Sequence, residues 1–475
     1  MRSGAVESNR KLAVVIMAAG KGTRLKSQRP KVLHEIGGQP LVAHVIAAAR
    51  QIAEPDDIYV VIGHQAEKVR SAVASTGVRF VEQREQLGTG HAIQCARSAI
   101  EDYENVLVLS GDVPLIRPET LERLWNFHRT EEAAMTILTA AVEDPSGYGR
   151  IVRRGPDSPE VEAIVEQKAL TAGQESLREI NSGIYAFQTA PLLVHLDRLS
   201  ADNANREVIL TDMAGLLRAA GERVVAIQAE AAGEAAEVLG ANTIAELVAL
   251  DRTLRMRTAE RLMAQGVTIF RPETSVIDAG VEVAADAVIE PFVQLLGRTK
   301  IGSGSLIRSY TVIEDCTLGE GVLIRQSSVL SGSTVADGAK IGPFAHLRPG
   351  SEIGEDVHIG NFVETKKTKL CKGAKAGHLT YLGDAVVGEG TNIGAGTITC
   401  NYDGVNKHVT RIGKDAFVGS DSTLVAPVTV GDGAYLGAGS CITSDVPANA
   451  LALGRARQIV KEGWAAEQRA GRKKK

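Results

Sequence analysis

The sequence is short of aromatic residues and of paired cysteines. Aromatic residues make up 4% of the 475 residues, and the five cysteines are widely spread, with no Cys-x-x-Cys pair. A disulfide framework and a structural zinc site are therefore not expected. No apolar run approaches the roughly 20 residues that span a membrane, and the opening MRSGAVESNR holds no apolar signal-peptide segment. We expect a cytoplasmic protein without a membrane partner.

An excess of charge of one sign is missing as well. The 53 Lys and Arg residues nearly balance the 57 Asp and Glu residues, which leaves a formal charge of −4. Binding of nucleic acid or of an anionic membrane surface through bulk charge is therefore not expected. The basic ending, GRKKK, is more typical of a solvated chain end than of a nucleic-acid tail. The chain is rich instead in glycine, with 49 residues, and its length predicts two or three domains.

The N-terminal half alternates short apolar runs with helical patterns. This rhythm predicts an α/β domain with a Rossmann-like, mostly parallel sheet over residues 11–240, after a disordered extension over 1–10. In the helical patterns, apolar residues recur at three- and four-residue spacing. The clearest predicted strands are 12–18, 58–63 and 105–110, and the clearest predicted helices are 41–53 and 90–100.

Residues 241–266 form the pattern of one long helix that joins two domains. An Asn-Thr pair stands where a helix cap would lie, an apolar stripe runs from Ile244 to Leu254, and Gly266 ends the pattern.

From residue 267 the helical pattern disappears and an aliphatic residue recurs every six positions. One aliphatic residue in six fits a short strand and a turn, and three such units make one coil of a parallel β-helix. We expect about nine coils spaced about 4.8 Å apart over 267–446, followed by an arm and a basic tail over 447–475. The alternative, a β-sandwich, predicts period-two alternation and Asn-Gly hairpin signals, which are missing. The repeating residues are Ile277, Val283, Ile289, Leu295, Ile301, Ile307 and Ile313, then, after a one-residue slip and some looser spacing, Val329, Val335, Ile341, Leu347, Ile353 and Ile359, then Ile412, Val418, Leu424, Val430, Leu436 and Ile442.

Two segments break the six-residue period, 362–371 and 400–410. Extra residues in a strict repeat predict loops, and loops often carry binding sites.

A glycine-rich turn follows the first predicted strand. Its glycines allow backbone N–H groups to approach phosphates, and Lys21, Arg24 and Lys31 supply positive charge nearby. The turn lacks the third glycine of a dinucleotide fingerprint and does not match a P-loop, so both are disfavoured. The turn reads Ala18-Ala19-Gly20-Lys21-Gly22-Thr23-Arg24.

The turn and the motifs after it resemble the sugar-1-phosphate nucleotidyltransferases. In order, the matching residues are Gln83, Gly88 and Thr89 in the loop that reads uracil in that family, then Ser110, Gly111 and Asp112 at a strand end, then Gly149, Glu166 and Asn181 in segments that hold the sugar and ribose. The resemblance implies attack of a sugar-1-phosphate oxygen on the α-phosphorus of UTP, with Lys31 and Arg24 on the phosphates. Ser110 departs from the pattern, because several relatives have Tyr there.

The same resemblance implies a metal site at Asp112 and Asn242. Asp112 follows a predicted strand, and ligands of open α/β sheets bind at the carboxyl ends of strands. Mg²⁺, or Mn²⁺ in its place, offsets the repulsion between two polyphosphates. The alternative interpretation is that the two residues only cap a turn and a helix.

Polar residues gather around the breaks in the repeat. The strings NFVETKK, KAGHLTYLGD, NIGAGT and NYDGVNKH lie close to those of the bifunctional bacterial N-acetylglucosamine-1-phosphate uridylyltransferase/glucosamine-1-phosphate acetyltransferase family, and the resemblance covers about 12–464. It implies a left-handed β-helix, an exception to the right-handed crossover rule, and homotrimers with the acetyl-transfer site between subunits.

In this family the second site acetylates an amino sugar. The amine is largely protonated near neutral pH, so a base must take its proton before it attacks acetyl-CoA, and a histidine suits that role. The resemblance implies His378 as the base, Arg348 and Lys366 on the sugar phosphate, and Tyr381 and Asn392 on the sugar. The implied acetyl-CoA residues are Ala395, Asn401, Tyr402, Ser420, Ala438 and Arg455.

Two alternative functions remain at this point. One is a single-activity sugar nucleotidyltransferase whose β-helix is structural, which gives no reason for His378 and the NYDG string. The other is a non-catalytic assembly module, which the presence of Lys31, Asp112 and His378 disfavours.

Overall fold

The computed structural model describes residues 10–155, 158–202, 206–229 and 234–472. The chain divides into two compact units, Met1–Leu254 and Arg255–Lys475, and each is considered by itself. The predicted disordered extension lies outside the described residues except for Arg10, which begins the first strand. The predicted domain limits stay predictions.

Unit 1 is built on a mostly parallel sheet, as predicted. The strand order is β11-β7-β10-β6-β1-β4-β5, and β10 is the antiparallel member, pairing with both β6 and β7. A hairpin of β8 and β9 joins at β10. The strands are β1 (Arg10–Met17), β4 (Ile58–Ile62), β5 (Arg79–Glu82), β6 (Tyr103–Ser110), β7 (Met135–Ala141), β8 (Arg150–Arg153), β9 (Val161–Val165), β10 (Glu179–Gln188) and β11 (Val224–Gln228).

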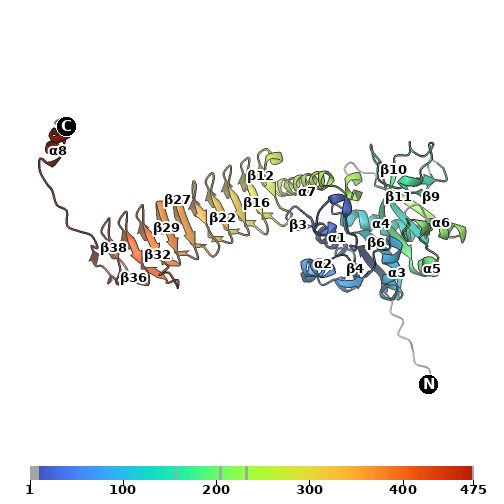
Figure 1. Cartoon of the computed structure of the whole chain (residues 1–475), viewed down its shortest axis with the longest axis horizontal. Helices are drawn as coiled ribbons and strands as arrows, with labels where there is room; N and C mark the ends of the chain where they lie inside the picture. Colours follow the sequence, from blue (N-terminus) through green and yellow to red (C-terminus); the bar gives the residue numbers. More distant parts are fainter. Residues whose placement is uncertain (1–9, 156–157, 203–205, 230–233, 473–475) are drawn as a thin grey trace, which may run out of the picture. The chain divides into compact units, whose positions relative to one another are not determined.

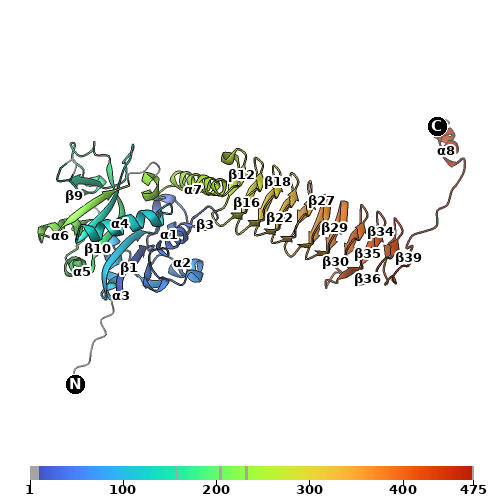
Figure 2. The ribbon, with the colours of Figure 1, turned by 180° about the vertical axis from the view of Figure 1, so that it is seen from behind.

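Helices cover both faces of this sheet (Figures 1 and 2). Alternate residues of β1 point to opposite faces, so Val14 and Ile16 pack in one core cluster and Ala13 and Val15 in the other. Helices α1, α2 and α4 share the first cluster, and α3, α5 and α6 share the second. The helices are α1 (Leu41–Ala49), α2 (Ala66–Val73), α3 (Thr89–Ile100), α4 (Pro118–Thr130), α5 (Thr189–Leu196) and α6 (Asp212–Ala219).

Unit 2 is a parallel β-helix with three faces (Figures 1 and 2). The third face is a sheet of nine strands, and the other two are joined at a corner by the long strands β27 (His358–Lys366) and β29 (Lys375–Gly383). The first face holds β12 (Thr268–Ile269), β15 (Val288–Ile289), β18 (Leu306–Ile307), β21 (Leu323–Ile324), β24 (Lys340–Ile341), β31 (Asn392–Ile393), β34 (Phe417–Val418), β37 (Tyr435–Leu436) and β39 (Leu451–Ala452). The second holds β13 (Val276–Ile277), β16 (Gln294–Leu296), β19 (Val312–Glu314), β22 (Val329–Ser331), β25 (His346–Leu347), β32 (Ile398–Cys400), β35 (Thr423–Val425) and β38 (Cys441–Ile442). The third holds β14 (Glu282–Val283), β17 (Lys300–Ile301), β20 (Thr317–Leu318), β23 (Thr334–Val335), β26 (Glu352–Ile353), β28 (Lys369–Leu370), β30 (Ala385–Val387), β33 (Thr410–Ile412) and β36 (Val428–Val430).

The repeating aliphatic residues fill the interior of the coils, with one correction. Val329 is 40% exposed, and its neighbour Leu330 takes the buried position. The steps from Ile313 to Leu318 and from Leu330 to Val335 are both five residues, so the interior positions shift by one at each of these two places. A turn shortened by one residue at each place keeps the aliphatic column in register, whereas the prediction placed its slip entirely before Val329.

The two predicted breaks differ in kind. His358 pairs with Lys375, 17 positions on, so the prediction of extra residues at 362–371 is wrong. There, β27 and β29 simply continue over a corner. The break at 400–410 is a true insertion, because Asn392 pairs with Phe417, 25 positions on.

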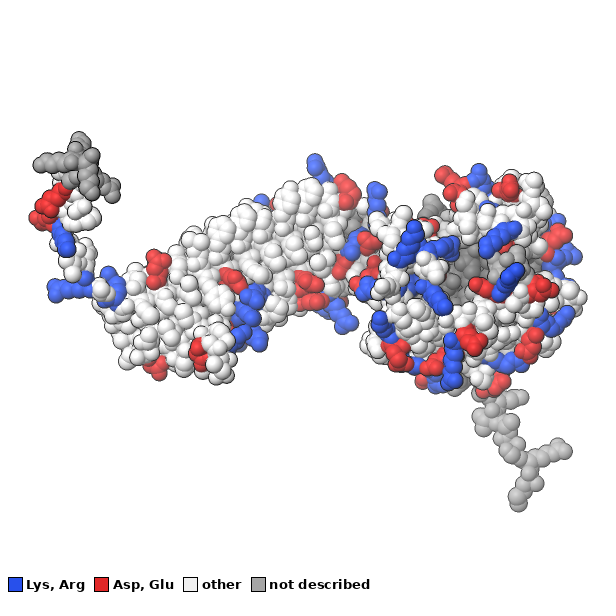
Figure 3. Space-filling model, in the orientation of Figure 1, with Lys and Arg blue, Asp and Glu red and all other residues white. Residues whose placement is uncertain are grey.

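The ends of unit 2 are helical. Helix α7 (Ile244–Ala264), at the place of the predicted linker helix, runs across the division between the units, and α8 (Trp464–Arg472) closes the described chain. No helix in the described ranges is long and apolar enough to cross a membrane. In the view of Figure 3, acidic and basic side chains mix over unit 1, whereas much of the β-helix surface in view is uncharged.

Candidate functional sites in the two units

A cavity with two adjoining lobes opens at the carboxyl ends of β1 and β6 in unit 1. The lobes have volumes of about 520 and 380 Å³ and share Met17, Thr89, Ser110, Asp112 and Glu207. The larger lobe also contains Ala18, Ala19, Gly20, Lys31, Gln83 and Gly88, and the smaller one Arg24, Gly149, Glu166, Asn181 and Asn242. Of the residues predicted for the nucleotide site, only Gly111 lines neither lobe. A Cβ at Gly111 would meet the Met17 carbonyl oxygen at 2.9 Å, so its absence lets β6 end against β1.

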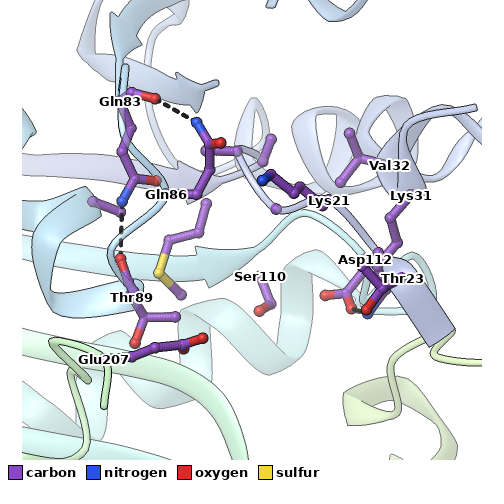
Figure 4. A pocket seen from close by; sticks show the side chains of 17 residues that line it. Lys21, Thr23, Lys31, Val32, Gln83, Gln86, Thr89, Ser110, Asp112 and Glu207 are labelled. Atoms are coloured by element: carbon purple, nitrogen blue, oxygen red, sulfur yellow. Dashed lines mark hydrogen bonds and ion pairs between the residues drawn. The ribbon is translucent and has the colours of Figure 1, made fainter. Parts of the chain in front are cut away.

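Opposite charges meet where the lobes join. The Lys31 ammonium forms an ion pair with the Asp112 carboxylate and donates to Asn242 Oδ1 at 2.9 Å. Arg24 donates to the same Asn242 oxygen at 2.7 Å. Asp112 follows β6, Lys31 begins the short helix Lys31–Leu33 and Asn242 precedes α7, so three distant segments meet here. Figure 4 shows Lys31 directed at Asp112.

These residues suit a hard divalent cation. A carboxylate and an amide oxygen already converge on one cation, the Lys31 ammonium, and Mg²⁺ prefers oxygen ligands. Within the described ranges, no cluster of three or more His, Cys, Asp or Glu side chains could hold a metal. Two protein oxygens with the remaining positions left to phosphates and water is the usual arrangement for Mg²⁺.

A tight loop lines the far end of the larger lobe. Gly88 has φ of +123°, and a Cβ there would lie 2.3 Å from the Val208 carbonyl oxygen. Glycine is therefore required for the loop to pack against 206–210. The loop presents the Gly88 carbonyl to the Gln83 amide at 2.9 Å.

The sequence prediction missed Glu207. It lines both lobes, and Figure 4 shows it beside Thr89 at the cavity wall. The nearby Thr211 hydroxyl donates to the predicted sugar residue Glu166 at 3.0 Å. The only signal in the sequence is Glu207 itself, within REVILTD, and no spacing rule distinguishes it from a solvent-exposed acidic residue.

In the β-helix, several predicted residues form a column along one corner. Ala395, Ser420 and Ala438 occupy the same position on successive coils, because the Ala395 carbonyl accepts from the Asp421 amide at 2.7 Å and the Ser420 carbonyl from the Gly439 amide at 2.7 Å. His378 holds this position one coil earlier, since Ala376 pairs with Ile393 and Tyr381 with Ile398, each 17 positions on, as Ala395 is from His378. The exposed ring of His378 lies opposite Asn361 in register, and Arg455 lies beyond Gly439, at the far end.

Cations gather at the next corner, at the other end of the same strands. Lys366 ends β27, and Arg348 pairs with Glu364 at 2.8 Å. The neighbouring Lys407 ammonium, and then Arg348, lower the pKa of Lys366. A lysine pKa that is lowered by neighbouring cations indicates a concentration of positive charge, which favours the binding of an anion. Lys407 is a second residue that the sequence prediction missed, although it lies within the NYDGVNKH string.

The inserted loop that carries Lys407 is held by its own side chains. Asp403 accepts from the amides of Asn406 at 2.6 Å and Val405 at 2.8 Å, and from the His408 ring at 2.7 Å. These hydrogen bonds, the Asn406 amide first, lower the pKa of Asp403 to about 2. At the base of the loop, the Asn401 amide donates to Asp384 at 2.5 Å.

The two predicted sugar residues are not together in one chain. Tyr381 lies on the second face between the two corners, opposite Glu364. A Cβ at Gly383 would overlap the Tyr381 ring, so that glycine makes room for the ring. Asn392 lies on the first face, opposite Lys375, on the far side of the His378 corner.

Comparison with known proteins agrees with two transferase domains. Residues 14–269 match the MobA-like NTP transferase domain, 332–367 match the bacterial transferase hexapeptide (six repeats), and 409–444 match the hexapeptide repeat of succinyl-transferase. The hexapeptide matches fit the predicted left-handed β-helix class.

Full-length relatives share one name. The chain is 59% identical to the Bifunctional protein GlmU of Koribacter versatilis (strain Ellin345), over 98% of this chain and 99% of that protein. It is 50% identical to the Bifunctional protein GlmU of Stutzerimonas stutzeri (strain A1501), over 95% and 98%. Identity of this extent, over both units, shows that the chain belongs to the Bifunctional protein GlmU family.

Proposed function

We propose that the chain makes UDP-N-acetylglucosamine in two steps. The β-helix unit transfers acetyl from acetyl-CoA to glucosamine-1-phosphate. Unit 1 then transfers UMP from UTP to N-acetylglucosamine-1-phosphate and releases pyrophosphate. Family membership makes the chain a uridylyltransferase and acetyltransferase, and the proposal assigns the substrates and the residues.

In unit 1, Lys31 and Arg24 bind the phosphates while Asp112 and Asn242 hold Mg²⁺ or Mn²⁺. The bound metal would supply charge neutralisation between the two polyphosphates. Such a transfer depends on positioning and charge more than on a proton-transfer residue. The convergence of Asp112 and Asn242 oxygens on the Lys31 ammonium supports this assignment. Gln83, Gly88 and Thr89 take the base, and Gly149, Glu166 and Asn181 take the sugar.

In the β-helix, His378 takes the proton from the amine. The cations Arg348, Lys366 and Lys407 bind the phosphate of the amino sugar, and Tyr381 lies between. From His378 to the Lys366 corner the strand covers about five residues, roughly 16 Å. A sugar phosphate that lies along the second face, with long Lys and Arg side chains reaching toward it, therefore has its amine near His378.

The observation that carries the proposal is the corner column. His378, Ala395, Ser420 and Ala438 rise along one edge, about 4.8 Å per coil, and lead to Arg455. The small side chains of Ala395, Ser420 and Ala438 leave that edge open for an extended molecule such as acetyl-CoA, whose acetyl end would lie at His378. Asn401 and Tyr402 lie on the inserted loop at the other corner, beside Lys407, and their assignment to acetyl-CoA rests on the family resemblance.

We assign the active form as a homotrimer in the cytoplasm. The position of Asn392, on the first face and away from Tyr381, supports a site that a neighbouring copy completes. Exposed apolar residues at the C-terminal end of the β-helix and beyond it, among them Leu451, Leu453 and Trp464, support the same arrangement.

The experiment that tests the acetyl step measures thiol release from acetyl-CoA on addition of glucosamine-1-phosphate. Wild-type protein should release thiol, and His378→Ala should be at least a hundredfold slower, since general-base catalysis contributes roughly 10²–10⁴-fold. No release by folded wild-type protein would leave the β-helix a scaffold and contradict the proposal.

The matching experiment for unit 1 measures pyrophosphate release from UTP. Asp112→Ala should lower it at least a hundredfold and leave thiol release unchanged. Near wild-type uridylyl transfer by this variant would show that the metal assignment is wrong.

A further inference from the structure

The Gln83 amide in the nucleotide lobe is held in one orientation by two neighbours. Gln83 is 3% exposed, and its Nε2 donates to the Gly88 carbonyl at 2.9 Å and lies 3.1 Å from His91 Nδ1. A carbonyl only accepts, so the nitrogen and not the oxygen of the amide must face Gly88. An amide nitrogen has two hydrogens, and these two neighbours engage both.

The contact also fixes the tautomer of His91. Because its Nδ1 faces a donor, it must accept, and the ring proton is then on Nε2. That atom lies 3.7 Å from the sulfur of Cys95, one turn further along α3. Burial raises the pKa of the Cys95 thiol, so the sulfur beside this ring stays uncharged. The Nδ1 atom of His91 is therefore an acceptor for the Gln83 amide.

The remaining polar atom of the Gln83 side chain is an acceptor. Figure 4 shows the Gln83 amide nitrogen turned toward the Gly88–Thr89 loop and its oxygen turned toward the cavity. In the described part of the chain, both hydrogen bonds of the side chain involve Nε2, and no protein group donates to Oε1. A base that enters this end of the lobe must then present an N–H group, because two facing acceptors in a half-buried site repel.

Uracil and cytosine differ at ring atom N3. Uracil carries an N3–H donor between its two carbonyls, whereas cytosine has a lone pair at N3. An amide free to rotate would serve either base, since it can offer oxygen to one and nitrogen to the other. An amide held by Gly88 and His91 presents its oxygen, which matches the N3–H of uracil and faces the N3 lone pair of cytosine.

We propose that His91 sets the base specificity of the nucleotide site by holding the Gln83 oxygen toward the cavity. This inference rests on the proposed uridylyl transfer. His91 is a positioning residue in it, because it lines neither lobe and acts through Gln83.

The test compares UTP with CTP in full-length wild-type protein and two variants, with N-acetylglucosamine-1-phosphate and Mg²⁺. His91→Phe keeps a ring and removes the acceptor, and His91→Asn keeps an oxygen near the position of Nδ1. The ratio of kcat/KM for UTP to that for CTP should fall at least tenfold in His91→Phe, mainly through KM for UTP. In His91→Asn the ratio should stay within about threefold of wild type.

Controls separate this role from packing. Trp125 fluorescence, read in a Trp464→Phe background, reports the folding of unit 1, and thiol release reports unit 2. If His91→Phe does not fold, His91→Leu replaces it. His64→Leu is the matched control, because the His64 ring contacts Gln65 and not Gln83. It should leave the UTP to CTP ratio within twofold of wild type.

Equal losses for UTP and CTP in both His91 variants would overturn the proposal and leave His91 a packing residue. Failure of wild-type protein to use UTP would overturn the proposed function instead. In that case, equilibrium binding of UTP and CTP to the same variants decides the role of His91. A tenfold fall in the preference for UTP in His91→Phe would support the proposal, and an unchanged preference would overturn it.

Discussion

The two units assemble their sites from different kinds of contact. In unit 1, Lys31 and Asn242 are 211 positions apart in the chain and yet share a hydrogen bond. In unit 2, His378 and Ala395 are 17 positions apart and occupy the same corner of successive coils. The first site depends on the sheet order and on which loops follow which strands. The second depends mainly on the length of a coil.

This difference predicts how far the effect of a destabilising substitution extends within each unit. Contacts of a solenoid run between neighbouring coils, so its stability is close to a sum of local terms. The core of unit 1 joins strands and helices from the whole unit, so a strongly destabilising substitution anywhere in it should also disturb the site. The predictions below test that contrast, beginning with the largest expected effect.

Matched core truncations should destabilise the two units separately. Leu107 on β6 and Leu347 on β25 are both fully buried. Replacing either by Ala should lower the free energy of unfolding of its own unit by about 2–5 kcal/mol, through lost burial and a cavity. Calorimetry should show Leu107→Ala moving one transition and Leu347→Ala the other, with pyrophosphate release lost at a lower temperature only in the first. A shift of both transitions by either variant would show that the units unfold together.

Acid should weaken unit 1 through His128. The ring is buried, its Nδ1 pairs with the Thr136 hydroxyl at 2.7 Å, and burial lowers the pKa of His128 to about 4. The unfolded chain takes up this proton near pH 6.5 and the folded chain only near pH 4, so stability is full above 6.5 and falls between 6.5 and 4. The free energy of unfolding of unit 1 should fall by at most about 3 kcal/mol through this residue.

Urea unfolding followed by Trp125 fluorescence measures this loss. Trp125 stacks on His128, and Trp464→Phe removes the other tryptophan of the chain. His128→Asn keeps an acceptor for Thr136 and cannot titrate, so it should remove most of the dependence between pH 6.5 and 4. An unchanged pH dependence in His128→Asn would mean that other groups cause the acid weakening.

The smallest expected effect concerns Lys407 on the inserted loop. Lys407→Met should raise KM for glucosamine-1-phosphate roughly ten- to a hundredfold and leave kcat within threefold, because it removes one charged contact to the phosphate. Lys369→Met is the control, since Lys369 pairs with Glu352 on the third face at 3.5 Å. An equal effect of the two variants would show that Lys407 acts only through general charge.

The sequence predicts more of the β-helix than of the sites. The six-residue period predicts the buried column, and among its predicted residues the structure corrects Val329, whose buried place Leu330 takes. The strands and helices of unit 1 follow from apolar spacing, with β1, β4 and β6 found within two residues of their predicted limits. The antiparallel β10 was not predicted, because apolar spacing carries no strand direction.

Site residues were accessible to sequence reasoning when they stood in a motif. Asp112 and His378 were predicted from such strings, although a lone Asp or His would have been read as a cap or a surface residue. Glu207 and His91 have no motif of their own, and their roles follow from packing. Glu207 reaches the cavity because 206–210 packs on the loop at Gly88, and His91 reaches Gln83 because α3 starts directly after that loop.

The inserted loop at 400–410 leaves the coil that carries it unchanged. Asn392 and Ile393 still pair in register with Phe417 and Val418, as if the extra residues were absent. Scaffold and chemistry can therefore vary independently in this unit. A corner can be lengthened, and its new residues selected for what they bind, while every interior contact is kept. The same corner is a natural place for an engineer to graft a foreign peptide.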